Sequence, residues 1–225
     1  MRLKTSKENT EIIRAVQHIY DGVIIELDYE TPFQLLCAVI LSAQATDKGV
    51  NRTTPPLFER VKYPEDMKRI SLDEVTELVK RINYFRNKAK FIHQTGIILA
   101  EKFGGIIPND LKLIQTLPGV GIKTAKVVLS VLYDQPFVGV DTHIHRVCNR
   151  IGIVKTPTPE KTDKAIEKRL TLEQRKNMHH PFVLFGRYQC LARNPKCRSC
   201  VLKEWCNFYA NTSMGVTSTP KTPLQ

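Results

Sequence analysis

One segment of the chain has almost no polar side chain, and it restricts the fold more than any other. Residues 32–42 read Pro-Phe-Gln-Leu-Leu-Cys-Ala-Val-Ile-Leu-Ser. Thr31 is a good N-cap and Pro32 suits the first position of a helix, so the segment is predicted to be helical. A helix that is apolar on every side has to be buried. We therefore expect residues 32–42 to form a helix in the core.

The rest of the chain also shows helical patterns. The only candidate strand is the short run Val23-Ile24-Ile25. Pro55-Pro56 is expected to interrupt the helix that Thr46 caps, and Ser71 and Glu74 form a capping box. The pattern predicts an all-α fold, with helices from Thr46 onward to the prolines and over 11–20, 71–81, 87–103, 109–117, 122–133, 141–151, 159–170 and 178–190.

The composition narrows the function. The 225 residues carry a formal net charge of +12, which attracts polyanions such as DNA; a basic protein without a nucleic-acid partner remains the alternative. No apolar run is long enough for a membrane span, and the polar start lacks a secretory signal. The sequence thus favours a cytoplasmic protein, and residues 211–225, rich in Ser, Thr and Pro, are expected to form a disordered tail.

The segment Leu117-Pro-Gly-Val-Gly-Ile-Lys-Thr-Ala125 predicts two short helices joined by a tight turn. Glycine permits backbone conformations that are closed to other residues. The backbone N–H groups of the turn stand at the N-terminus of the second helix, where they can bind a phosphate. Such a contact carries no base sequence. A simple helical corner is the alternative, but the full string is more specific. We expect Gly119, Val120, Gly121 and Thr124 to contact DNA.

Lys123 and Asp141 are the candidate reacting residues. Lys123 stands in the first turn of the second helix, where the helix dipole and partial burial would lower the pKa of its amine. A neutral amine can act as a nucleophile, although a phosphate-binding lysine would suit the same position. Asp141 is expected to cap the next helix, a role compatible with catalysis. The intervening chain is long enough for the two side chains to meet.

Four of the six cysteines lie close together near the C-terminus. The spacing is Cys190-x6-Cys197-x2-Cys200-x5-Cys206. In a reducing compartment this cluster predicts a metal site, and by spacing alone it suits zinc and a [4Fe–4S] cluster about equally. Arg193 and Lys196 lie in the same loop and are expected to contact phosphates, a solvated charged loop being the alternative. The remaining cysteines, Cys37 and Cys148, are expected to be buried.

The stretch from Leu117 to Arg150 resembles the helix-hairpin-helix and Gly/Pro-Asp loop of the endonuclease III family of DNA glycosylases, and the resemblance extends over about residues 8–209. It implies that Lys123 and Asp141 are catalytic, as in the family's bifunctional members. It implies [4Fe–4S] in place of zinc. It further implies that Gln44 fills the gap left by a flipped base and that Ser42, Asp47 and His143 line the lesion pocket, although each has an ordinary capping or surface alternative.

One position departs from the family pattern. Where the family often has a leucine wedge before its Lys-Ala pair, this chain has Tyr84. A tyrosine can stack on a base, so a wedge role at Tyr84 is retained. The departure leaves open which base this protein prefers opposite the lesion. We assign no function to the second local oddity, Pro55-Pro56.

The resemblance implies two all-α lobes: a six-helix barrel with the hairpin at 25–135, and a cluster domain formed by 1–24 together with 136–210. The expected function is that of a monomeric base-excision-repair glycosylase and abasic-site lyase, acting on duplex DNA with oxidised pyrimidines or abasic sites. We expect it in a prokaryotic cytoplasm, associated with the nucleoid. Two alternatives remain: a monofunctional thymine, uracil or adenine mismatch glycosylase, and a non-catalytic hairpin protein that only binds DNA.

Overall fold

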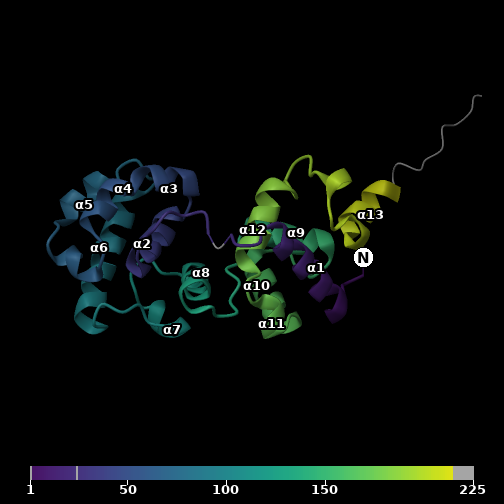
Figure 1. Ribbon diagram of the computed structural model, residues 1–225, viewed down its shortest axis with the longest axis horizontal. Coiled ribbons are helices and arrows are strands. Elements are labelled where there is room, and N and C mark those ends of the chain that lie inside the picture. The colour runs from purple at the N-terminus through teal and green to yellow at the C-terminus, as the bar shows by residue number, and fades with distance from the viewer. Residues whose placement is uncertain (1, 24, 215–225) are drawn as a thin grey trace, which may run out of the picture. The chain divides into compact units, whose positions relative to one another are not determined.

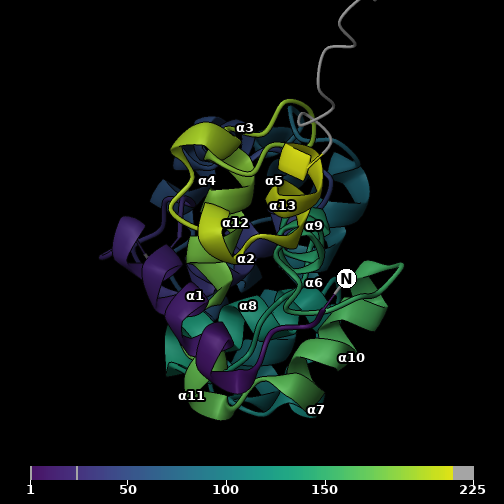
Figure 2. The same cartoon turned by 90° about the vertical axis from the view of Figure 1, so that its right-hand side faces the viewer.

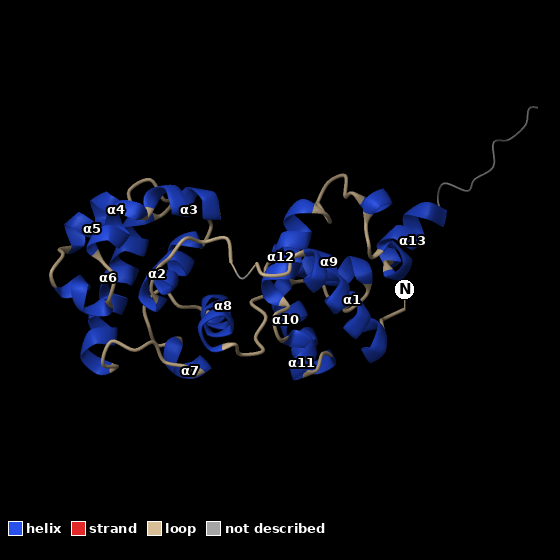
Figure 3. Cartoon of the chain, in the orientation of Figure 1, coloured by secondary structure: helices blue, strands red, loops and turns tan. Residues whose placement is uncertain are grey.

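The structure, a computed structural model, describes residues 2–23 and 25–214. Within these ranges the chain is helical and contains no β-strand (Figure 3). The candidate strand at 23–25 includes residue 24, which lies outside the described residues, as do residues 215–225 of the expected tail. No helix of the described chain is both long enough and apolar enough to cross a membrane.

The chain forms two compact units, Ile24–Gly139 and Met1–Val23 with Val140–Gln225. The sequence-based division gave the first unit as residues 25–135, whereas the compact unit spans Ile24–Gly139. The second unit is discontinuous because the N-terminal helix packs with elements from the C-terminal half: α1 (Ser6–Ile19) lies against α12 (His179–Tyr188) (Figure 2).

The first unit is built around α2 (Pro32–Ser42), as Figure 1 shows. Thr31 caps this helix by accepting a hydrogen bond from the Gln34 N–H, and every residue from Phe33 to Leu41 is buried. The prediction of a core helix is confirmed. Around α2 lie α3 (Asp47–Thr53), α4 (Pro55–Arg60), the 3₁₀ turn η1 (Pro64–Lys68), α5 (Leu72–Leu78), α6 (Phe85–Lys102), α7 (Leu111–Ile114) and α8 (Ile122–Tyr133).

Side-chain caps explain where several of these helices begin. Thr46 caps α3, Ser71 and Glu74 form the predicted capping box of α5, and Asp110 accepts hydrogen bonds from the first turn of α7. Pro55 does interrupt the helix, but it also begins α4 because proline fits a first helical position. The 3₁₀ turn η1 was not predicted.

The second unit packs α1 and α12 with α9 (Thr142–Ile151), α10 (Pro159–Arg169) and α11 (Leu172–Arg175). Its core includes Ile12, Val16, Val147, Phe182 and Phe185, all almost fully buried. Cys148 is buried in this core and Cys37 in that of the first unit, as expected.

The C-terminal part of the second unit is less regular. It contains the 3₁₀ turns η2 (Cys197–Ser199) and η3 (Lys203–Trp205) and then α13 (Asn207–Met214). Residues 211–214 therefore belong to a helix, whereas the sequence placed them in a disordered tail. The helix is held from its first residue, because Asn207 bonds to the Arg2 carbonyl and to the Lys4 ammonium.

The packing of α6 against η1 and α2 depends on Gly96. A Cβ atom built at this position would lie 2.8 Å from Cβ of Met67 and 2.9 Å from Cζ of Phe33. Both neighbours are buried, so neither can move freely. The absence of a side chain at Gly96 is what allows α6 to approach this closely.

We predict that Gly96→Ala destabilises the protein. Overpacking costs about 1–3 kcal/mol, while alanine gains at most about 1 kcal/mol in helix preference. The expected net loss is about 1 kcal/mol, measured as a change in urea midpoint at constant slope. Gln94→Ala, an exposed site on the same helix, is the control and should not lower the midpoint; equal midpoints for both variants would contradict the packing argument.

Candidate active site and metal centre

The hairpin between α7 and α8 uses its two glycines in different ways. Gly119 has a φ of +77°, and a Cβ atom there would lie 2.8 Å from Cβ of Phe91 on α6. Gly121 caps α8 with a φ of −80°, and a Cβ atom there would meet nothing within 4 Å. Gly119 is thus needed for the turn and for packing on α6, and Gly121 is the position where another molecule can come close to the backbone.

The hairpin is also fixed by hydrogen bonds. The buried Thr95 hydroxyl donates to the Pro118 carbonyl at 2.9 Å. The Val120 N–H donates to the Leu117 carbonyl at 3.1 Å, and the Val120 side chain is buried. The amide of Val120 is therefore already bonded within the hairpin. Thr124 is half-buried on the first turn of α8.

Lys123 lies in that first turn, and its side chain is exposed. The partial burial expected from the sequence is thus not present in the protein alone. The side chain is open to solvent beside the N-terminus of α8 and the hairpin turn.

Asp141 caps α9, as predicted. Its carboxylate accepts a hydrogen bond from the Ile144 N–H at 2.8 Å, and the residue is half-buried. Lys123 belongs to the first unit and Asp141 to the second, so their meeting at one cleft stays a prediction.

His143 is the second residue of α9 and is tightly packed. A Cβ atom built on Gly186 of α12 would lie only 2.7 Å from the His143 Cβ, so the two helices can approach this closely only because position 186 is glycine. The Arg146 guanidinium lies 3.2 Å from His143 Nδ1. Burial lowers the pKa of His143; the Asp141 carboxylate opposes this shift and Arg146 adds to it. The neutral imidazole is therefore favoured.

The loop after α2 and the loop before α6 are brought together within the first unit. Gln44 and Asn83 line one hollow, about 770 Å³ including open solvent, together with Ala45, Thr46, Gly49, Arg81 and Ile82. Tyr84 follows directly and is 67% exposed. Ser42 and Asp47 flank the Gln44 loop; the Ser42 hydroxyl donates to the Val39 carbonyl at 2.9 Å, and Asp47 begins α3.

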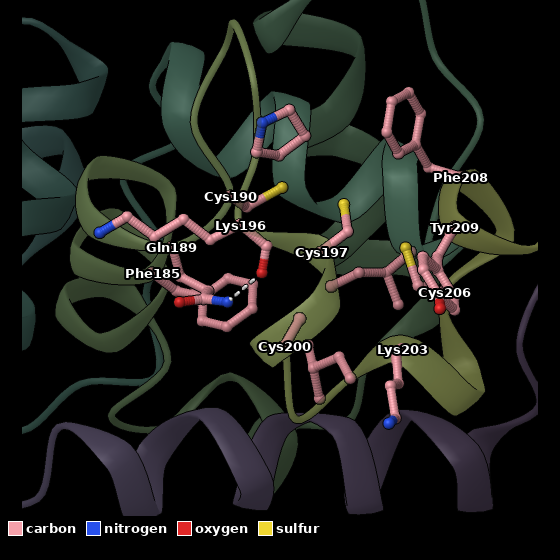
Figure 4. Close-up of a pocket in the computed structure, with 13 residues that line it drawn as sticks. Phe185, Gln189, Cys190, Lys196, Cys197, Cys200, Lys203, Cys206, Phe208 and Tyr209 are labelled. Carbon is pink, nitrogen blue, oxygen red and sulfur yellow. Dashed lines mark hydrogen bonds between the residues drawn. The ribbon is translucent and has the colours of Figure 1, made fainter. Parts of the chain in front are cut away.

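All four clustered cysteines line a single pocket of the second unit (Figure 4). Each is a free, half-buried thiol. Burial raises the pKa of Cys197, Cys200 and Cys206, and the neighbouring cysteines raise it further. Among the described residues, no group of three or more His, Cys, Asp or Glu is arranged to hold a single metal ion. The residue types nevertheless suit a thiolate-bound cluster, because four cysteines line one pocket.

Two arginines of α9 hold the cysteine loop, and the sequence pattern did not single them out. Arg150 donates to the Leu191 carbonyl at 2.6 Å and to the Ala192 carbonyl at 2.9 Å, and it lies 3.5 Å from Cys190 Sγ. Arg146 donates to the carbonyls of Cys190 and Gly186. Their spacing of one helical turn was the available signal, since side chains four residues apart share a helix face.

The basic residues of the loop face solvent. Arg193 and Lys196 are exposed. The loop backbone is pinned by paired hydrogen bonds, because the Lys196 N–H donates to the Gln189 carbonyl at 3.1 Å and the Gln189 side chain donates to the Lys196 carbonyl at 2.7 Å (Figure 4). The loop thus presents positive charge from a fixed backbone.

We predict that Asp141→Asn and Asp141→Ala separate the capping role of this residue from any role in chemistry. Asparagine is a good N-cap, so Asp141→Asn should cost at most a few tenths of a kcal/mol, whereas Asp141→Ala should cost about 1 kcal/mol. The free energy of unfolding of each variant, measured in urea, checks this. Equal losses in the two variants would contradict the cap.

Comparisons with known proteins give consistent results. Residues 37–171 match the family model described as HhH-GPD superfamily base excision DNA repair protein. The chain is 42% identical to endonuclease III of Haemophilus influenzae over 183 residues, which is 81% of this chain and 87% of that protein. It is 40% identical to endonuclease III of Escherichia coli, with the same coverage of both chains.

Solved structures agree. A trapped endonuclease III–DNA covalent intermediate, an estranged-adenine complex, superposes with a TM-score of 0.84 at 35% identity and covers 94% of this chain and all of that one. A thermostable thymine-DNA glycosylase gives a TM-score of 0.80 at 20% identity, covering 92% of this chain and all of that one. This second likeness shows the fold alone.

Proposed function

Because the chain belongs to the endonuclease III family within the HhH-GPD superfamily of base excision DNA repair proteins, we propose that Lys123 and Asp141 are the reacting pair of a DNA glycosylase and abasic-site lyase. Lys123 is the observation that carries this proposal. It is an exposed amine in the first turn of α8, two residues after the hairpin glycine Gly121, which leaves open space beside the backbone. A strand held there would bring a sugar within reach of the amine.

The chemistry runs in two stages. The Asp141 carboxylate accepts a proton from the Lys123 ammonium, and the free amine attacks C1′ of the damaged nucleotide. The glycosidic bond breaks and the base leaves with the bonding electron pair. The sugar ring then opens to a Schiff base between Lys123 and C1′. Loss of a C2′ proton expels the 3′ phosphate, which cuts the strand by β-elimination.

The alternative role of Asp141 is electrostatic and applies where it does not take the Lys123 proton. Positive charge develops on the sugar as the base departs, and the ionised Asp141 carboxylate would stabilise it. Capping does not prevent this, because a carboxylate has two oxygens and the Ile144 N–H uses one lone pair of one oxygen. The half-buried position of Asp141 strengthens the interaction relative to bulk water.

The remaining site residues serve binding. Gly119, Val120, Gly121 and Thr124 present the hairpin to the DNA backbone, and Arg193 and Lys196 add positive charge from the cysteine loop. The damaged base leaves the helical stack, Gln44 and Tyr84 fill the gap, and Ser42, Asp47 and His143 line the lesion pocket. Oxidised or ring-saturated pyrimidines are the proposed substrates.

The four cysteines would hold a [4Fe–4S] cluster. Cys190, Cys197, Cys200 and Cys206 line one pocket, and cysteine thiolates are the usual ligands of such clusters. The cluster would pin the C-terminal loop and take no part in bond making. Arg150 lies 3.5 Å from Cys190 Sγ and would place a positive charge beside the cluster.

The protein acts as a monomer on double-stranded DNA. It works in the cytoplasm of a prokaryotic cell, in association with the nucleoid. The relatives named above are bacterial, and the excess of 34 basic over 22 acidic residues suits a polyanionic partner.

We predict that Lys123→Gln abolishes strand cleavage and keeps DNA binding. Glutamine has similar length but no nucleophilic amine. The measurement is borohydride trapping on a duplex that contains one thymine glycol, together with a binding titration. The native protein should give a covalent adduct that Lys123→Gln does not give, with affinities within about three-fold of each other, since one phosphate contact at most is lost.

The control for that experiment is Lys126→Gln, a lysine on the same helix that is buried. Normal nicking by Lys123→Gln would rule out the assignment of the nucleophile. An intact abasic strand as the product of the native protein would instead indicate a monofunctional glycosylase.

We predict that Cys200→Ala removes the cluster, because a site with three thiolates holds it weakly. The brown absorbance and the iron and sulfide content per chain should fall to near zero, whereas Cys37→Ala, outside the pocket, should keep full iron content. Zinc in place of iron in the purified native protein would contradict the assignment.

A further inference from the structure

Gln44 and Tyr84 share an unusual backbone conformation. Their φ angles are +54° and +58°, in the left-handed region that residues with side chains seldom occupy. Such conformations persist only where the surrounding structure holds them, and they gather at functional sites. Both residues are exposed and lie in loops of the first unit, so burial of their own side chains does not hold them.

Asn83 joins the two loops. Its side-chain Nδ2 donates to the Gln44 carbonyl at 3.3 Å, across 39 residues of sequence. On one side of Asn83 is Ile82, which is buried, and on the other is Tyr84. The hydrogen bond therefore connects the peptide of Gln44 to an anchored segment that ends at Tyr84.

Lys88 makes a second connection. The residue is only 5% exposed, its Nζ donates to the Leu41 carbonyl at 2.9 Å, and its backbone N–H donates to the Tyr84 carbonyl at 3.2 Å. Leu41 lies in the last turn of α2, whose C-terminus is the negative end of the helix dipole and favours a cation. Lys88 thus ties the end of α2 to the start of α6.

These two connections surround the two strained residues. Asn83 holds the carbonyl of Gln44, and the Lys88 side chain holds the helix end before Gln44. The bond from the Lys88 N–H to the Tyr84 carbonyl is the first backbone hydrogen bond of α6, so it places Tyr84 at the start of that helix. Burial lowers the pKa of Lys88, so the buried ammonium costs free energy that its hydrogen bond offsets. An exposed lysine on α6 would not carry this cost. The buried position and the bond to Leu41 therefore indicate that Lys88 holds the end of α2 in place, which an exposed lysine would not do.

We propose that Asn83 and Lys88 are positioning residues that hold Gln44 and Tyr84 as one preformed element for filling the gap that a flipped nucleotide leaves in the duplex. This inference rests on the proposed function, in which both side chains enter DNA. Preorganisation means that the cost of ordering the loops is met during folding and not during base extrusion. The exposed Tyr84 ring is then ready to stack on a neighbouring base.

The test measures, without turnover, the extrusion of an abasic nucleotide and the filling of the gap that it leaves. The probe is a duplex with one tetrahydrofuran abasic analogue and 2-aminopurine as its 3′ neighbour, mixed with protein carrying Lys123→Gln. The rate at which 2-aminopurine fluorescence rises after mixing reports the step. In the Lys123→Gln background, Asn83→Ala should lower this rate about five-fold, the effect of one lost neutral hydrogen bond. Asn87→Ala, an exposed asparagine on α6, is the matched control and should change the rate less than two-fold.

Lys88→Met, with Lys90→Met as its exposed control, tests the second connection and should have an effect at least as large. If Lys88→Met fails to fold by circular dichroism, Asn83→Ala still decides, because Asn83 is exposed and its removal leaves the core intact. Equal rates for Asn83→Ala and Asn87→Ala overturn the proposal.

A double-mutant cycle separates positioning from a merely structural role. If Asn83 acts through Gln44 and Tyr84, Asn83→Ala should change the rate less than two-fold when Gln44→Ala and Tyr84→Ala are already present. A full five-fold effect in that background overturns the proposal. Borohydride trapping by the native protein on an abasic duplex keeps the outcomes distinct: a missing adduct counts against the proposed function, and an adduct together with unchanged extrusion rates counts against this inference alone.

Discussion

The burial of α2 is the constraint on which much of the first unit depends. The helix lacks a polar face, so other helices have to cover it, and every residue from Phe33 to Leu41 is buried. Because α2 cannot shift without exposing apolar surface, its C-terminal end has a fixed position. The Gln44 loop follows directly from that end, and Lys88 bonds to it. The most buried helix of the unit therefore positions an exposed loop that carries candidate DNA-contacting residues.

In the second unit the corresponding part is α9. Asp141 caps its N-terminus, while Arg146 and Arg150 bind the loop that carries the cysteines. The guanidinium of Arg150 also stacks on the Phe208 ring, with 4.6 Å between Cζ and the ring centroid. One rigid helix thus carries the candidate catalytic carboxylate and the polar anchors of the cysteine loop. The loop has little regular structure of its own, so these contacts and a bound cluster would supply its order.

In both units the exposed candidate site residues stand on segments whose backbone is fixed by hydrogen bonds and packing. The hairpin is held by Thr95 and by the contact of Gly119 with Phe91. The cysteine loop is held by the two arginines and by Gln189. Lys123, Arg193 and Lys196 project from these supports into solvent. Supports fixed by buried contacts suit an enzyme that must place a sugar and a nucleophile within a few ångströms.

The sequence by itself determined what depends on neighbours along the chain. Thr31, Ser71, Asp110 and Asp141 cap the helices that they were predicted to cap, because capping involves residues two or three positions apart. The cysteine spacing and the hairpin string likewise identified the family from short segments.

Only the tertiary structure decided features that depend on distant partners. Lys88 looks like a surface lysine in sequence, yet Leu41 makes it a buried one. The positive φ angles of Gln44 and Tyr84, the fit of Phe91 against Gly119, and helix α13 past residue 210 were not visible in the sequence. The Lys88 bond to Leu41, the Asn83 bond to Gln44 and the Phe91 contact with Gly119 all join residues far apart in the chain, and local propensity contains no information about such contacts.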